Sequence, residues 1–149
     1  MNPTNTDPVV KRRVVSIDTA TAFELFTRRL EEWWPLDTHS VSGHDLAGVR
    51  FEERVGGRVL EVTPDGARYS WADVVAWDPP YRFALSWHPT PEPVAASRIE
   101  VTFSEAESGT IVNIHHSGWK EFNRNASRLR NEYDRGWEVV LAAFTAAAD

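Results

Sequence analysis

The sequence predicts an α+β fold, in which a curved antiparallel β-sheet of six to seven strands wraps around a long C-terminal α-helix. The stretch between Phe51 and Trp119 alternates apolar and polar residues, as strands with one buried face do. Near the C-terminus, apolar residues recur every three or four positions and give a helix one wide apolar face. These positions are Ala126, Leu129, Tyr133, Trp137, Val140 and Phe144. A face of this width needs a partner, and the sheet supplies it.

The first strand is expected over residues 9–17, which alternate and are rich in valine. Two short helices should follow it. Asp18 or Thr19 offers an N-terminal cap, and Thr21 with Glu24 has the spacing of a capping box.

These short helices carry Phe23, Phe26 and Leu30 at helical intervals and are expected to run as far as Pro35, which cannot continue a helix. Residues 36–48 are polar and contain two glycines, which predicts a long loop. Loops of this length in compact domains often have a function, so this one is a candidate lid.

Turn-forming residues then recur at regular intervals and divide the chain into strands. The turns are Gly56-Gly57, Asp65-Gly66, Asp78-Pro79-Pro80 and Glu107-Ser108-Gly109. The strands between them are expected at 49–55, 58–63, 69–77, 81–87, 98–104 and 110–117. Residues 88–96 contain three prolines, which excludes a regular strand there.

The final helix is expected over residues 125–147. Gly136 lies on its apolar face, where glycine costs about 1 kcal/mol relative to alanine. We interpret this glycine, beside Trp137, as keeping space open between helix and sheet. Close packing of the helix on the sheet is the alternative explanation.

Composition is typical of a single globular domain. The 149 residues suffice for one core, assigned to residues 9–147 behind a flexible arm over residues 1–8. A net charge of −6 and the lack of a basic stretch with interleaved aromatics argue against nucleic acid as a partner. No run approaches the ~18 apolar residues of a membrane span, and the N-terminus has no signal-peptide pattern. We therefore expect a cytoplasmic protein, either a monomer or a weak homodimer, that does not bind membranes.

Several short motifs, in this order and spacing, give the chain a family resemblance over residues 9–144. They are Trp33-Trp34-Pro35, Gly56-Gly57-Arg58, Asp78-Pro79-Pro80, Trp87, Val112-x-Ile114-x-His116-x-Gly118 and Tyr133-Asp134-x-Gly136-Trp137. The chain resembles the helix-grip, Bet v 1-like and START-like (SRPBCC) superfamily, in its branch of Hsp90-ATPase-activator-homologue-1-like (AHSA1) domains. The resemblance implies a hydrophobic cavity between sheet and helix that binds a small, mostly apolar molecule.

A hydrophobic or aromatic ligand in such a cavity would contact a defined set of residues. The predicted lining is Trp34, Trp71, Phe83, Leu85, Trp87, Val101, Ile114, His116, Tyr133, Gly136, Trp137 and Val140. For each aromatic member, plain core packing is the competing explanation, since aromatic side chains dominate cores. Trp33-Trp34-Pro35 with His39 is a further candidate for a lid at the cavity mouth.

His115 and His116 are adjacent in a predicted strand and must point to opposite faces, so they cannot chelate one metal ion. The register of Val112 and Ile114 turns His116 inward and His115 outward. An inward histidine is either a hydrogen-bonded core residue or a polar anchor that orients a ligand.

The sequence carries no recognisable catalytic motif, because G-x-S-x-G, HExxH, P-loop and dinucleotide patterns are all missing. There is no cysteine, which excludes disulfides and thiolate chemistry. The five histidines lack metal-ligand spacing, so no cofactor, metal or catalytic residue is expected. This pattern favours a non-catalytic protein that binds a small molecule, in stress response or in natural-product resistance by sequestration.

Two alternatives remain open. A polyketide cyclase or dehydratase would use the same cavity, with His116 as acid or base, and a co-chaperone would act on an Hsp90-type ATPase. Within the branch, the nearest resemblance is to self-sacrifice resistance against calicheamicin. That activity needs an exposed glycine, which the resemblance places after Trp87, and residues 88–96 contain none.

Overall fold

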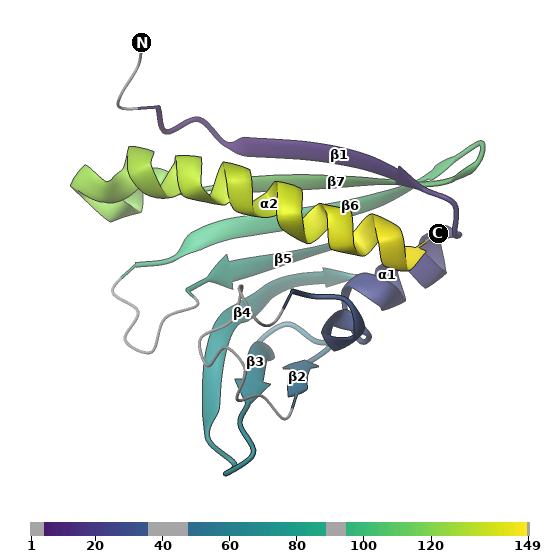
Figure 1. The fold of residues 1–149 in the computed structure, drawn as a ribbon, viewed down its shortest axis with the longest axis horizontal. Coiled ribbons are helices and arrows are strands. Elements are labelled where there is room, and N and C mark those ends of the chain that lie inside the picture. Colours follow the sequence, from purple (N-terminus) through teal and green to yellow (C-terminus); the bar gives the residue numbers. More distant parts are fainter. Residues whose placement is uncertain (1–4, 36–47, 89–94, 149) are drawn as a thin grey trace.

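Seven strands form one antiparallel sheet that curls around the long helix α2 in the computed structural model, which describes residues 5–35, 48–88 and 95–148 (Figure 1). The strands are β1 (Val9–Val15), β2 (Gly48–Phe51), β3 (Arg58–Val62), β4 (Arg68–Asp78), β5 (Arg82–Trp87), β6 (Ser97–Ala106) and β7 (Gly109–Ser117). The helices are α1 (Thr19–Phe26) and α2 (Ala126–Ala148), with 3₁₀ turns η1 (Leu30–Glu32) and η2 (Trp119–Asn125). The predicted fold class is confirmed.

The strand order is β1-β7-β6-β5-β4-β3-β2, so the first and last strands of the chain are neighbours. Each strand otherwise pairs with the next one along the sequence, which matches the regular spacing of the turns. The expected strand 49–55 is shorter than predicted, because β2 ends at Phe51 and a turn through Gly56, at φ 87°, leads into β3. The candidate lid over residues 36–48 and His39 lie almost entirely outside the described residues.

The first helix begins as predicted and ends earlier. Asp18 is its cap and accepts a hydrogen bond from the backbone N–H of Thr21 at 2.8 Å. The capping box expected for Thr21 and Glu24 is wrong, because Glu24 instead pairs with Arg28 one turn later. The hydroxyl of Thr27 donates to the carbonyl of Phe23, and α1 ends there rather than running to Pro35.

Strand β4 contains two bulges that bend the sheet. Its register against β3 skips Trp71, and its register against β5 skips Val75. An extra residue in one strand bends it and strengthens its twist. The first bulge leaves both Trp71 and Ala72 buried on the concave side, which brings Trp71 toward the helix.

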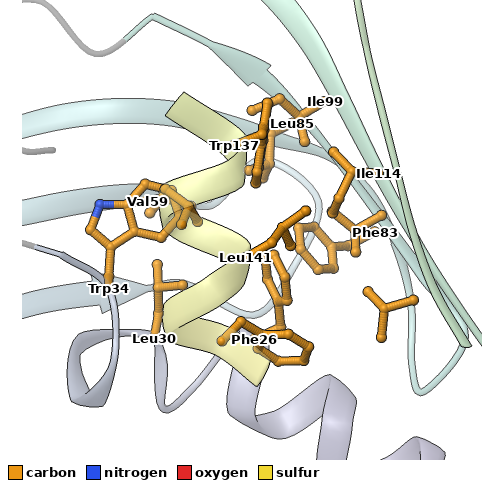
Figure 2. Close-up of a cluster of buried hydrophobic side chains, with 14 of the residues drawn as sticks. Phe26, Leu30, Trp34, Val59, Phe83, Leu85, Ile99, Ile114, Trp137 and Leu141 are labelled. Atoms are coloured by element: carbon orange, nitrogen blue, oxygen red, sulfur yellow. The ribbon is translucent and has the colours of Figure 1, made fainter. Parts of the chain in front are cut away.

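Helix α2 lies across the concave face with the predicted apolar positions turned inward. Its buried residues include Trp137, Val140, Leu141 and Phe144, and Figure 2 shows Trp137 and Leu141 pointing from α2 into the cluster on the sheet. A charged group fixes the helix to the edge strand β1. The ammonium of Lys11 lies 2.9 Å from Asp134 and 2.7 Å from Glu138.

Over the described residues, none of the helices is both long and apolar enough to cross a membrane.

Candidate functional site

The centre of the site is His116 on β7, whose side chain is fully buried between sheet and helix. The predicted orientations are confirmed, because His115 next to it is exposed. Both ring nitrogens of His116 have partners. Its Nε2 lies 2.7 Å from Oγ of Ser97 on β6, and its Nδ1 lies 2.9 Å from Nε1 of Trp137 on α2.

The partner Trp137 fixes the direction of this hydrogen-bond chain. An indole N–H only donates, so Nδ1 of His116 must accept and carries no proton. Burial lowers the pKa of His116 to about 3, with a smaller contribution from His115, so the ring is neutral at pH 7. The single ring proton is therefore on Nε2 and is donated to the Ser97 hydroxyl. This arrangement is the reverse of a serine activated by a histidine base, so His116 is not a base for Ser97.

Two further aromatic residues close around His116. The ring of Trp119 lies 4.4 Å from the imidazole and that of Tyr133 lies 4.9 Å from it, measured between centroids. The hydroxyl of Tyr133 accepts a hydrogen bond from Nε1 of Trp87 at 3.0 Å. Burial raises the pKa of the Tyr133 phenol, which keeps it protonated near neutral pH.

We call Ser97, His116 and Tyr133 the polar group. Beside it, four tryptophans from four different parts of the chain pack together. The ring of Trp34, which follows η1, lies 5.5 Å from that of Trp71, 6.1 Å from Trp87 and 6.4 Å from Trp137. The last three are each oriented by an indole hydrogen bond, to Glu61, Tyr133 and His116 respectively. We call these four residues the tryptophan cluster.

Described residues of the sheet, of α2 and of the segments beside them enclose a small cavity. The cavity has a volume of about 20 Å³, enough for roughly one water molecule. All of its lining residues are apolar: Phe26, Leu30, Trp34, Phe51, Val59, Phe83, Leu85, Trp87, Ile99, Val101 and Trp137. Figure 2 shows part of this group, including Trp34, Leu85, Ile99 and Trp137. The small-molecule pocket of several hundred Å³ expected from the sequence remains a prediction, and this cavity is much smaller because aromatic rings, Trp34 among them, surround it.

The predicted lining residues fall into two groups. Trp34, Phe83, Leu85, Trp87, Val101 and Trp137 line the small cavity. The other six do not line it. Trp71 packs against Trp34, and His116 and Tyr133 form the polar group with Ser97. Ile114 and Val140 are buried in the core, and Gly136 is half-buried in α2. Of the five residues expected to share one pocket, Trp87 and Trp137 line this cavity, and the shared pocket remains a prediction.

Two residues of the site escaped the sequence analysis. Glu61 on β3 is fully buried, and its carboxyl accepts a hydrogen bond from Nε1 of Trp71 at 2.6 Å. Ser97 is buried beside His116. Alternation along each strand was the available signal, since Glu61 is two residues from the inward Val59 and Ser97 is two residues from the inward Ile99. In the parts of the chain that the structure describes, no three His, Asp or Glu residues are placed to hold a metal ion.

Comparison with known proteins finds one matching family model and several solved structures with a similar fold. The family model "Activator of Hsp90 ATPase homolog 1-like protein" matches residues 17–149. The chain is similar to the solved structure of CalC, a self-sacrificing resistance protein from Micromonospora echinospora, with a TM-score of 0.73 and 24% identity over 99% of this chain and 96% of that one. No curated protein sequence matches it.

Two other solved structures are also similar. An anthrahydroquino-gama-pyrone synthase, Txn09, is 30% identical over 98% of this chain and 99% of that one, with a TM-score of 0.63. Protein Ms6760 from Mycobacterium smegmatis is 20% identical over 97% and 91%, with a TM-score of 0.69.

Proposed function

The chain belongs to the family of activator of Hsp90 ATPase homolog 1-like proteins, and from this premise we propose that it binds a flat, largely apolar aromatic molecule between the sheet and α2. The observation that carries the proposal is the position of Trp34 among Trp71, Trp87 and Trp137. The last three rings are held in place by hydrogen bonds through their indole nitrogens. We call Trp71, Trp87 and Trp137 the aromatic frame. Their rings already pack around one further aromatic side chain, that of Trp34.

In this proposal the ligand replaces the ring of Trp34 within the frame. The cavity of about 20 Å³ is too small for a fused-ring compound, so the ligand must displace a side chain. Trp34 is the candidate, because it comes from a segment outside the sheet and α2. A ligand ring that takes its place recovers the same stacking and edge-to-face contacts. The name of the relative Txn09 refers to an anthrahydroquino-pyrone, which is a compound class of this shape.

The test is a direct binding measurement with three matched pairs of aromatic compounds. Each pair shares one ring skeleton and differs by its carbonyl groups: xanthone and xanthene, anthraquinone and anthracene, fluorenone and fluorene. We expect saturable quenching of tryptophan fluorescence by members of this panel, with one site per chain by calorimetry. Absence of saturable binding by all six compounds would overturn the proposal.

Two matched variants locate the binding. Trp87→Phe removes part of the aromatic frame and should weaken binding by about tenfold. Trp77→Phe makes the same change in a half-buried tryptophan that packs on Phe23 and Phe51, outside the frame, and should leave binding unchanged. Equal loss in both variants would place the ligand elsewhere.

Catalysis in the same site is the second candidate, favoured by one observation. Glu61 is a fully buried carboxyl next to Trp71 on the concave side of the sheet, and buried carboxyls serve as general acids or bases. His116 is poorly suited to that role, because Trp137 and burial keep it neutral and its proton is directed at Ser97. Conversion of a bound polyketide-type compound by the wild type, lost in Glu61→Gln, would establish this function.

A further inference from the structure

Among the residues that the structure describes, the hydroxyl proton of Ser97 has no acceptor. Its hydroxyl is 4% exposed and accepts the Nε2–H of His116, which the donor Trp137 forces into that direction. Buried hydroxyls normally both donate and accept, so the Ser97 hydroxyl proton is available to an acceptor other than the described residues.

The hydroxyl proton of Tyr133 also has no acceptor among the described residues, and this follows from a different hydrogen bond. The hydroxyl oxygen of Tyr133 accepts the Nε1–H of Trp87. The phenol keeps this proton near neutral pH because burial raises its pKa. Because the Trp87 indole only donates, the Tyr133 hydroxyl accepts from it and can use its own proton as a donor. The Trp137 indole has the same effect on Ser97 through His116.

Both hydroxyls border the same tryptophan of the frame. Ser97 is the direct cross-strand partner of Trp87 in the pairing of β5 with β6, and Tyr133 is hydrogen-bonded to the Trp87 indole. Residues directly opposite on neighbouring strands have Cβ atoms about 5 Å apart. A ring that packs against Trp87 therefore has two hydroxyl donors near it.

Building on the proposed function, we infer that the ligand carries a carbonyl-type oxygen on its aromatic ring system and that this oxygen accepts hydrogen bonds from Ser97 and Tyr133. The chain Trp137–His116–Ser97 polarises one donor, and Trp87 polarises the other. The apolar frame selects a flat aromatic compound, and the two hydroxyls select the oxygen and fix its orientation.

The test uses the carbonyl and deoxy members of each pair, with xanthone and xanthene as the primary probes. We expect wild-type protein to bind xanthone about tenfold more tightly than xanthene. Ser97→Ala and Tyr133→Phe should each reduce this preference by at least threefold, and the double variant should abolish it. Xanthene affinity should fall less than xanthone affinity in all three variants, which separates loss of a donor from general damage to the site.

Matched controls remove the same groups from the surface. Ser104→Ala lies on the same strand as Ser97 with its side chain exposed, and Tyr81→Phe changes an exposed tyrosine, so both should keep the wild-type preference. Binding of the panel with no preference for the carbonyl member in any pair would overturn this inference alone and leave the proposed function standing. The same holds for a preference that survives in the double variant. Absence of binding by every compound would overturn the proposed function and the inference together.

Discussion

The indole N–H of Trp137 donates to Nδ1 of His116 over 2.9 Å, and this bond joins the middle of α2 to the end of β7. It has two effects. It ties the helix to the sheet at a polar point inside an otherwise apolar interface, and it selects the tautomer of His116 that donates to Ser97. The orientation of every donor in the polar part of the site follows from this contact and from the bond between Trp87 and Tyr133.

We predict that His116 makes the fold sensitive to acid. Unfolded chains protonate histidine near pH 6.5, whereas the folded protein keeps His116 neutral down to about pH 3. The unfolded state therefore binds the extra proton in this window, and the free energy of unfolding falls as the pH drops from about 6.5 toward 3.

The measurement is the urea midpoint at pH 7 and pH 4.5. His116→Gln keeps a hydrogen-bond acceptor and a donor but has no titrating group. Its free energy of unfolding should therefore fall by about 2 kcal/mol less than that of the wild type between pH 7 and pH 4.5. His115→Gln, on the exposed neighbour, should behave as wild type. Identical pH dependence in His116→Gln and wild type would contradict the assignment.

Truncation of Trp34 should create a hole that free indole refills. Trp34→Ala removes the ring that packs on Trp71, Trp87 and Trp137, and we expect a loss of about 3–5 kcal/mol in stability. Millimolar indole should then raise the melting temperature of this variant, because a ligand that binds only the folded state stabilises it. The wild type and Trp77→Ala serve as controls, and a similar rise in either of them would argue against a specific site.

Gly136→Ala distinguishes open space from close packing at the helix. Alanine favours the helix by up to about 1 kcal/mol, so the melting temperature should stay or rise if the glycine leaves room for a ligand. Xanthone binding should weaken, because the methyl group enters that space. A lower melting temperature with unchanged binding would show that Gly136 serves close packing, where overfilling costs about 1–3 kcal/mol.

The ion pair between Lys11 and Glu138 should contribute measurably to docking of α2. Lys11 is largely buried in its side chain and lies 2.7 Å from Glu138 and 2.9 Å from Asp134. A double-mutant cycle of Lys11→Met and Glu138→Gln should give a coupling energy of about 0.5–1 kcal/mol, which falls in high salt. The exposed pair Arg128–Glu132 is the control and should couple more weakly. A coupling no larger than that of the control would show that Lys11 does not fix the helix.

Most of the fold was predictable because its signals are local. Alternation and turn residues placed all seven strands, and the apolar positions from Ala126 to Phe144 placed α2 within a residue or two at each end. The bulges at Trp71 and Val75 were not predicted, since a bulge is a property of two paired strands and leaves no mark in one of them.

The site was less predictable, for a physical reason. The inward direction of His116 followed from strand periodicity, and its need for partners followed from burial. Which partners it has depends on residues far away in sequence, Ser97 and Trp137. The volume of a cavity is hard to predict because it is a small difference between large packed volumes, and the position of a single ring such as that of Trp34 changes it.

The pairing of β1 with β7 also bears on how the protein is made. Val9 lies opposite His116, so β1 cannot pair with β7 until the much later segment that contains His116 has been synthesised. Contacts between such distant segments slow folding, and an unpaired valine-rich strand is prone to aggregation while it waits. Because β1 and α2 also meet through Lys11, these two elements should dock together late, after β4, β5 and β6 have formed their hairpins.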